Sequence, residues 1–408
     1  MSDIPLEVVA DFLSRVPAMS LLRFRCVSKQ WRSIIDSPEF IKMHLNRTLH
    51  TKSDRKLILR SCYLYSADFD GLDNTNVAHY VKVEHPWKRP EIGTLIVGSC
   101  HGILCLDGGV EDKSILLWNP TTRKHFKLPP SKFERSMESF RKRTMVFGFG
   151  YDKASEDYKV LRILQSYYMD SEVKVFSMKS KSWRKIANFP YYLKYQSAPG
   201  VLVSGSLHWV VTKDPDTFMV NLIGAFDLET EEYRLVPQPD YPKKKSKNFH
   251  LNVVALDGSL CGLCNYYDHE YVDVWVMKKY LVNESWTKLF KVAESDTRIK
   301  PFHYVMPIAY SWSGRRVYMV QNDKMPLWYD LEKKKVIPTK YHISDPPSYM
   351  EHQMCFGSLV QLDGGISGMV ERVQDTKEEL IGSSKGTKKN GNNNKKDNFL
   401  SVGFKLVL

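Results

Sequence analysis

The chain has 408 residues, 43% of them hydrophobic and 12% aromatic, and a formal net charge of +13. This length fits two or three domains, or a small domain and one large one. No apolar run reaches the ~18 residues of a membrane span, and the N-terminus shows neither a secretory leader nor a Met-Gly start, so we expect no membrane span and no secretion. The seven cysteines are odd in number and irregularly spaced, which indicates a reduced, intracellular protein.

The first 45 residues contain four short helical patterns. Pro5 suits the first turn of one helix, which Pro17 ends, while Ser28 and Ser37-Pro38 suit the starts of two later helices. Nearly half of this stretch is apolar, more than so small a unit can bury alone. Two interpretations remain open: the helices dock on the rest of the chain, or a second protein covers the apolar surplus.

The same stretch resembles an F-box over about 40 residues. The matching residues, in order, are Ile4-Pro5, Phe12-Leu13, Val16-Pro17, Leu21, Arg25, Val27-Ser28-Lys29-Gln30-Trp31, Ile34-Ile35 and Pro38-x-Phe40. Ile4 replaces the usual Leu, and Ser28 replaces the usual Cys. The resemblance implies docking on the Skp-type adaptor of a cullin–RING ubiquitin ligase.

The resemblance also implies which side chains take part in adaptor binding. They are Ile4, Pro5, Val9, Phe12, Leu13, Val16, Pro17, Leu21, Leu22, Val27 and Trp31. We expect Leu13, Leu21, Val27 and Trp31 to combine adaptor contact with holding the helices together.

From about Leu57 onward the pattern changes to short β-rich runs separated by turns, which predicts an all-β domain. Five segments share one order: a strand with an aromatic residue, a polar turn and a second strand. Their leading aromatic residues are Trp118, Phe176, Phe226, Trp275 and Trp328. A repeat of about 50 residues is typical of kelch-like propeller blades. Gly102, Gly205, Gly258 and Gly314 each precede a further strand, which we assign to the inner half of a blade.

A sixth blade is expected from the two ends of this region. A strand pair at 57–69 and a late strand at 355–360 each lack partners, and pairing them closes a ring without exposed edges. Six blades are favoured, seven remain open, and an irregular pair of β-sandwiches is the alternative fold.

This region is similar to the plant F-box-associated interaction domain. The likeness rests on Trp118-Asn119-Pro120-Thr121-Thr122-Arg123, Gly148-Phe149-Gly150-Tyr151-Asp152, Leu207-His208-Trp209 and Ala225-Phe226-Asp227-Leu228. Residues 271–278, 285–288 and 399–408 resemble family members that act in plant defence. That likeness implies, as the protein substrate, intracellular immune receptors of the nucleotide-binding leucine-rich-repeat class.

The expected domains are an F-box (1–45), a linker (46–56), the propeller as substrate-binding domain (57–362), a basic, mostly disordered low-complexity tail (363–398) and an apolar C-terminal peptide (399–408). Short lysine runs at 243–245, 388–389 and 395–396 have the composition of weak nuclear signals, and solvated loops are the alternative interpretation. We therefore expect a cytoplasmic and nuclear protein.

Catalytic and metal-binding patterns are weak. Cys261 and Cys264 have the spacing of a metal knuckle, but residues i and i+3 of a strand point to opposite faces. His101, His208 and His303 lack a neighbouring nucleophile or carboxylate pattern, and no phosphate loop or RING-type array is present. We expect no cofactor, no metal, no nucleic-acid partner and no catalysis by this chain.

The predicted function is that of a substrate-recognition subunit of a Skp–cullin–F-box ubiquitin ligase, with the adaptor, the cullin and the RING subunit as partners. The alternatives are a propeller scaffold without a ligase link and a propeller enzyme. Tyr191, Tyr192, Tyr195, Tyr266 and His303-Tyr304, together with Tyr167, Tyr168 and Tyr267, are expected in connections, where aromatic residues serve binding.

Overall fold

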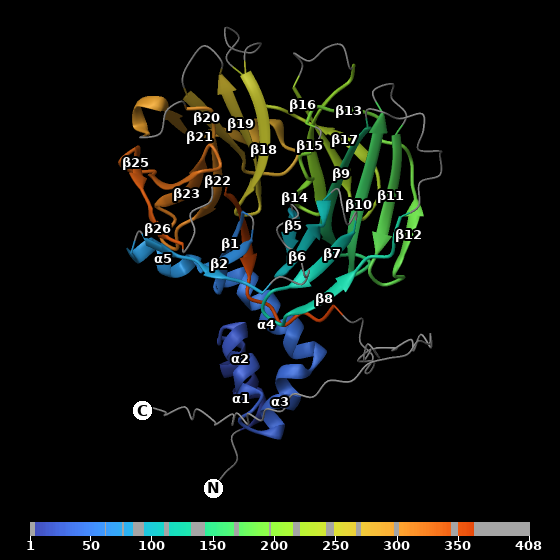
Figure 1. Cartoon of the computed structure of the whole chain (residues 1–408), viewed down its shortest axis with the longest axis vertical. Coiled ribbons are helices and arrows are strands. Elements are labelled where there is room, and N and C mark those ends of the chain that lie inside the picture. Colours follow the sequence, from blue (N-terminus) through green and yellow to red (C-terminus); the bar gives the residue numbers. More distant parts are fainter. Residues whose placement is uncertain are drawn as a thin grey trace, which may run out of the picture. The chain divides into compact units, whose positions relative to one another are not determined.

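A computed structural model gives the fold of the chain (Figure 1). It describes residues 5–362 except 62, 76, 85–93, 110–113, 132–142, 167–170, 196, 215–220, 242–248, 267–270, 298–301 and 344–349. The described residues all belong to one compact unit, Met1–Gly365. Ile4, the lysine run at 243–245, Tyr167, Tyr168, Tyr267, the tail and the C-terminal peptide lie outside the described residues.

Four helices open the described chain: α1 (Leu6–Ser14), α2 (Ala18–Phe24), α3 (Lys29–Asp36) and α4 (Pro38–Thr51). Ser28 Oγ accepts a hydrogen bond from the Trp31 backbone N at 3.0 Å, and Ser37 Oγ accepts one from the Phe40 N at 3.2 Å. Both predicted caps are therefore confirmed, and Ser28 gives α3 a hydroxyl cap. No helix in the described part of the chain is both long and apolar enough to cross a membrane.

A propeller of six blades follows in the described residues, which confirms the predicted fold class (Figure 1). Four blades consist of β5 (Leu95–Cys100) to β8 (Lys124–Lys127), β9 (Arg143–Asp152) to β12 (Ser182–Lys185), β18 (Phe249–Leu256) to β21 (Trp286–Ala293), and β22 (Val305–Tyr310) to β25 (Lys335–Pro338). A fifth runs from β13 (Tyr192–Leu193) to β17 (Tyr233–Val236). Between these bounds lie β6 (Ile103–Asp107), β7 (Ile115–Asn119), β10 (Asp157–Ser166), β11 (Ser171–Ser177), β14 (Val201–Val203), β15 (Ser206–Thr212), β16 (Leu222–Asp227), β19 (Ser259–Tyr266), β20 (Tyr271–Met277), β23 (Arg316–Gln321) and β24 (Met325–Asp330).

The repeat read from the sequence corresponds to the blade. The five leading aromatic residues lie on β7, β11, β16, β20 and β24, each the third strand of a four-strand run. The predicted turn glycines lead into the second strands, and Gly205 and Gly258 have φ of 76° and 81°. Glycine adopts positive φ at little cost because it has no Cβ, which explains why it occupies these turn positions.

The sixth blade closes the ring from both ends of the domain. Its strands are β27 (Glu351–Phe356), β1 (Arg55–Arg60), β2 (Leu64–Asp68) and β4 (Val81–Lys82), with β1 antiparallel to both β2 and β27. The predicted closure is therefore confirmed. The late strand ends at Phe356, however, and we call residues 357–362, which follow it, the exit segment.

Two small elements beside this blade have no counterpart in the sequence-based prediction. Helix α5 (Phe69–Thr75) follows β2 directly, and β3 (Val77–His79) forms a parallel pair with β26 (Lys340–His342). The Phe69 side chain is fully buried, with its ring centroid 5.6 Å from that of Tyr318 and 5.7 Å from that of Trp328. Contact with the neighbouring blade thus fixes this turn of helix.

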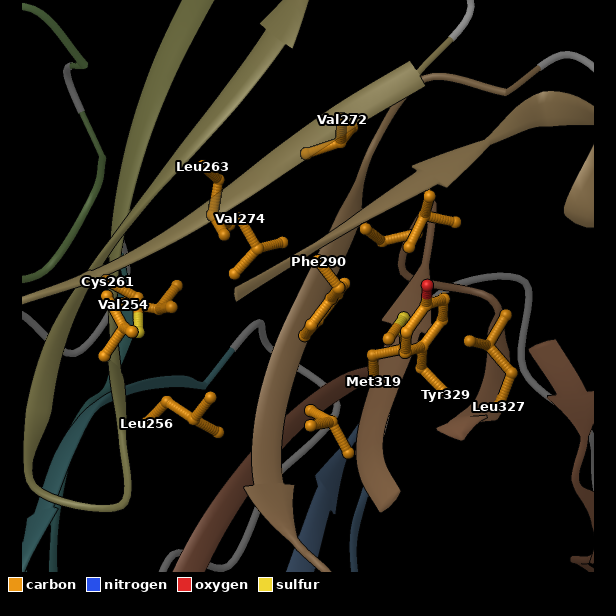
Figure 2. Packing of buried hydrophobic residues seen from close by; sticks show 14 residues of the cluster. Val254, Leu256, Cys261, Leu263, Val272, Val274, Phe290, Met319, Leu327 and Tyr329 are labelled. Carbon is orange, nitrogen blue, oxygen red and sulfur yellow. The ribbon is translucent and has the colours of Figure 1, made fainter. Parts of the chain in front are cut away.

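The core lies between blades. Figure 2 shows one cluster, to which the blade of β18–β21 gives Val254, Cys261 and Phe290 while the next blade gives Met319 and Tyr329. Cys264 lies instead in the cluster shared with the preceding blade. The two cysteines therefore point to opposite faces of β19, as the alternation of a strand predicts.

The helical unit contacts one set of turns of the propeller. Lys42 on α4 forms an ion pair with Glu156 in the β9–β10 turn (2.5 Å), and Lys52 forms one with Asp257 in the β18–β19 turn. Both pairs lie where the first two strands of a blade meet. Exposed pairs of this kind contribute only ~0–1 kcal/mol each, so they orient the unit more than they hold it.

Candidate protein-interaction site

A small core lies among the four helices. Leu13, Ala18, Leu21, Ile35 and Phe40 are at most 3% exposed and pack together. The buried His44 ring adds a polar contact, because its Nε2 hydrogen-bonds with the Val16 carbonyl at 2.9 Å. Burial lowers the pKa of His44, which favours the neutral ring.

Large apolar side chains remain exposed around this core. Phe12 is 55% exposed, Val8 56% and Val27 62%; Leu6, Met19 and Met43 are also exposed. Val8 and Phe12 are four residues apart on α1, so they are neighbours on one face of the helix. Some of the apolar side chains of these helices are therefore buried between them, and others are exposed to solvent, as at a protein interface.

The predicted adaptor-binding residues fall into two groups. Leu13 and Leu21 are fully buried, so in the free chain they hold the helices together. The others are exposed or half-buried, namely Pro5, Val9, Phe12, Val16, Pro17, Leu22, Val27 and Trp31. Leu6, Val8, Met19 and Met43 are exposed apolar residues that our sequence reading left out. For Val8, a sequence signal exists: it lies four residues before Phe12, on the same face of a predicted helix.

Charged groups border these side chains. Asp11 pairs with Arg15 at 2.7 Å and with Arg47 at 3.2 Å, and these guanidinium groups keep the pKa of Asp11 below its usual value. Arg25 joins α2 to Asp36 at the end of α3, with its Nε 2.7 Å from the carboxylate. Exposed apolar residues surrounded by charges have the composition of an interface core and its polar rim.

Two of the three histidines singled out in the propeller, His101 and His208, have structural partners. His101 Nδ1 lies 3.2 Å from Tyr158 Oη, and His208 lies between the Val201 carbonyl (3.0 Å) and Tyr280 Oη (2.8 Å). Burial lowers the pKa of both rings to about 4. Both are therefore neutral hydrogen-bonding groups near pH 7.

The buried thiols of the propeller are chemically quiet. Burial raises the pKa of Cys100, Cys261 and Cys355 to about 12, so little thiolate forms near neutral pH. All six cysteines that the structure describes are unbridged. Within the described residues, no three His, Cys, Asp or Glu side chains are arranged to hold a metal ion.

The aromatic residues expected in connections differ in their surroundings. Tyr191, Tyr192 and Tyr195 are half-buried, and Tyr195 Oη donates to the Leu251 carbonyl at 2.7 Å. Tyr192 lies in strand β13, so its placement in a connection was wrong. Tyr266 is only 3% exposed, so its placement in a connection was wrong: it ends β19 and packs in a core cluster. Among the predicted pair His303-Tyr304, the histidine is exposed.

A hollow of about 390 Å³ lies between the end of α4 and the propeller turns. Its lining includes Lys52, Arg55, Asp257, Tyr310 and Trp312. Asp257 is ion-paired with Lys52, and Arg55 with Asp70 at 2.7 Å. Trp312 is 64% exposed.

Comparison with known proteins finds one family match for the helical unit and one for the propeller. Residues 1–43 match the model of the F-box domain, and residues 55–358 match that of the F-box associated beta propeller domain. The chain is 37% identical, over the full length of both proteins, to F-box protein CPR1 of Arabidopsis thaliana. It is 28% identical over full length to F-box protein At4g22390, and 31% identical to F-box/kelch-repeat protein At3g23880, with 73% of this chain and 82% of that one covered, both of the same plant. The chain therefore belongs to the family of F-box proteins that carry an F-box-associated β-propeller domain.

Proposed function

We propose that this chain is the substrate-recognition subunit of a Skp–cullin–F-box ubiquitin ligase. The observation that carries the proposal is the exposed apolar set on the F-box helices, with Phe12 and Val27 each more than half exposed. An F-box docks on a Skp-type adaptor, and exposed apolar groups of this size mark interaction surfaces. The exposed residues of the predicted adaptor-binding set lie among them.

The proposed mechanism is proximity. The F-box ties the chain to the adaptor and, through it, to the cullin and RING subunits, while the propeller holds the target protein. Ubiquitin is then transferred to target lysines by other subunits, so this chain contributes effective concentration rather than catalysis.

For the target, we propose the propeller face away from the F-box contacts. The turns that touch the helices, such as those of Glu156 and Asp257, occupy the other face. On the proposed face, Lys194 is half-buried and its Nζ donates to the amide oxygen of Asn221. Burial lowers the pKa of this lysine, so an acidic target residue would compensate its charge.

We propose intracellular immune receptors of the nucleotide-binding leucine-rich-repeat class as targets, and the cytoplasm and nucleus as the site of action. The likeness to plant-defence members of the family supports this choice, as does full-length identity of 37% to one Arabidopsis F-box protein. Unbridged cysteines fit a reducing compartment.

The test is co-expression of such a receptor in plant cells with the wild-type chain or with the double variant Phe12→Asp and Val27→Asp. The receptor level is expected to fall with the wild type, to recover with a proteasome inhibitor, and to stay high with the double variant. Val81→Asp is the matched control, because Val81 is exposed (68%) but lies on the propeller strand β4. Equal receptor levels with the wild type and the double variant would refute the proposal.

A further inference from the structure

The core of the F-box helices contains one residue from the far end of the chain. Leu359 is 2% exposed and packs with Leu13, Leu21, Ile35 and Phe40. It belongs to the exit segment, which follows the last propeller strand. More than 300 residues of propeller therefore separate it from its packing partners in sequence.

The exit segment is tied to the start of α2 through Asp54. The Gly357 backbone N donates to the Asp54 carbonyl at 2.8 Å, and Asp54 Oδ2 accepts from the Ala18 backbone N at 2.9 Å. A Cβ on Gly357 would lie 1.8 Å from that same carboxylate oxygen. Only glycine therefore leaves Asp54 in place to hold the first residue of α2.

On its other side, the exit segment is held by the first complete blade. Asn119 is fully buried, and its Nδ2 donates to the carbonyls of Ser358 and Val360, each at 3.0 Å. Its Oδ1 accepts from the Thr121 backbone N at 2.9 Å, which fixes the turn. These bonds give the Trp118-Asn119-Pro120-Thr121-Thr122 motif a structural role, because its asparagine binds the backbone of the exit segment.

The side chains of the exit segment divide between the two domains. Leu359 packs with the helices, whereas Val360 and the 1%-exposed Leu362 pack in a propeller cluster. Helices of so few residues bury little surface by themselves, so one missing core side chain weakens the whole unit.

We propose that the adaptor-binding module of this chain is discontinuous, made of helices α1–α4 and Leu359 of the exit segment. This inference rests on the proposed adaptor docking. The exit segment thereby completes the core that supports the adaptor-binding side chains, and it fixes the orientation in which a captured target is presented.

The test compares Leu359→Ala with Leu362→Ala in the full chain, since both remove a buried leucine from the same segment. Affinity for a purified plant Skp-type adaptor is measured by calorimetry, and backbone hydrogen exchange of α2 and α3 is measured on the free chain. Leu359→Ala is expected to weaken adaptor binding about tenfold or more and to speed exchange in α2 and α3. Leu362→Ala is expected to change adaptor affinity by less than about twofold.

Asn119→Ala provides a second variant, because the Asn119 side chain bonds to the exit segment and to its own turn rather than to the helices. It is expected to weaken adaptor binding about fivefold, because both hydrogen bonds to the exit segment are lost. Wild-type affinity and unchanged exchange in Leu359→Ala would overturn the inference and leave the proposed function intact. Failure of the wild-type chain itself to bind the adaptor would overturn both.

Discussion

Neighbouring residues of α1 have opposite surroundings. Phe12 is 55% exposed, and Leu13, the next residue, is fully buried against Leu21 and Phe40. One side chain is thus available to a partner, while the other stabilises the helices. Likewise, Val27 is exposed and Ile35 is buried.

Substituting these two neighbours is expected to give different results. Phe12→Asp should lower adaptor affinity about tenfold or more while changing the free energy of unfolding by less than ~0.5 kcal/mol, since the side chain is exposed. Leu13→Ala should cost ~2–5 kcal/mol because it opens a cavity in the helical core. Calorimetric titration with the adaptor and chemical denaturation measure the two effects. Loss of helix in Phe12→Asp would contradict this assignment.

Two buried or half-buried lysines allow a second comparison. Lys159 Nζ lies 2.9 Å from an Asp152 oxygen and 3.1 Å from a Glu231 oxygen, and it donates to the Leu228 carbonyl at 2.6 Å. Because Glu231 belongs to the next blade, this lysine joins two blades. Lys194, by contrast, donates its Nζ hydrogen bond to an amide oxygen.

Lys159→Met is expected to destabilise the propeller by ~3 kcal/mol or more, because the buried Asp152 carboxylate loses its cation and Glu231 keeps only Arg184. Lys194→Met should leave stability within ~0.5 kcal/mol of the wild type or raise it, since a desolvated charge is removed. Guanidinium denaturation of both variants measures the difference. Equal destabilisation by both substitutions would argue that Lys194 is a structural residue.

Buried histidines set the pH dependence of stability. Burial lowers the pKa of His208 to about 4 and that of His352 to about 3, below the ordinary value near 6.5. The unfolded chain therefore binds more protons than the folded one below pH 6.5. Stability should fall as the pH drops from about 6.5 to about 4, by up to ~1.4 kcal/mol per pH unit for each histidine.

The check is thermal unfolding at pH 7.5 and 5.0 for the wild type and for His208→Gln. The wild type should lose the larger share of its stability between these values. Burial raises the pKa of Glu351, which acts in the opposite direction at lower pH, so the comparison between the two proteins isolates the histidine. Identical losses in both proteins would count against a neutral buried His208.

At the level of elements, local signals in the sequence were sufficient for the helices and the blades. Ser28 and Ser37 cap α3 and α4, and the aromatic repeat marks the third strands, because both depend on residues close together in the chain. The pairing of β1 with β27 followed from the need to close an open ring.

What the sequence did not reveal depends on contacts between distant residues. Helix α5 exists where Phe69 meets Tyr318 and Trp328, and Tyr266 is buried by a neighbouring blade rather than by its own segment. The contribution of Leu359 to the helical core belongs to the same class, since no local pattern distinguishes it from an extension of β27. The exposed Met19 and Met43 carry no signal in a single sequence that separates them from core residues.

Because β27 closes the ring, removing this strand is expected to destabilise the propeller. A chain ending at residue 349 lacks β27 and leaves β1 with an unpaired edge, so we expect loss of the cooperative thermal transition, with aggregation. A chain ending at residue 362 keeps β27 and the exit segment and should melt within a few degrees of the full chain. Calorimetric scans of both test this, and a native-like transition in the shorter chain would contradict the closure.

At the scale of the molecule, the F-box helices and the propeller meet at one set of contacts. The helices pair with Glu156 and Asp257, in turns that join the first two strands of a blade, and they pack against Leu359 of the exit segment. Under the proposed function, a target bound to the opposite face would be held at a defined position relative to the ligase. This arrangement requires no catalytic group from the chain itself.

The central claim is that this chain links a target-binding propeller to a cullin ligase through its F-box. Mass photometry of the purified full chain mixed with a plant Skp-type adaptor and cullin tests it most directly. We predict one species with the summed mass of the three proteins, which disappears with Phe12→Asp and Val27→Asp but persists with Val81→Asp. A chain that remains separate while adaptor and cullin form their own complex would contradict the claim.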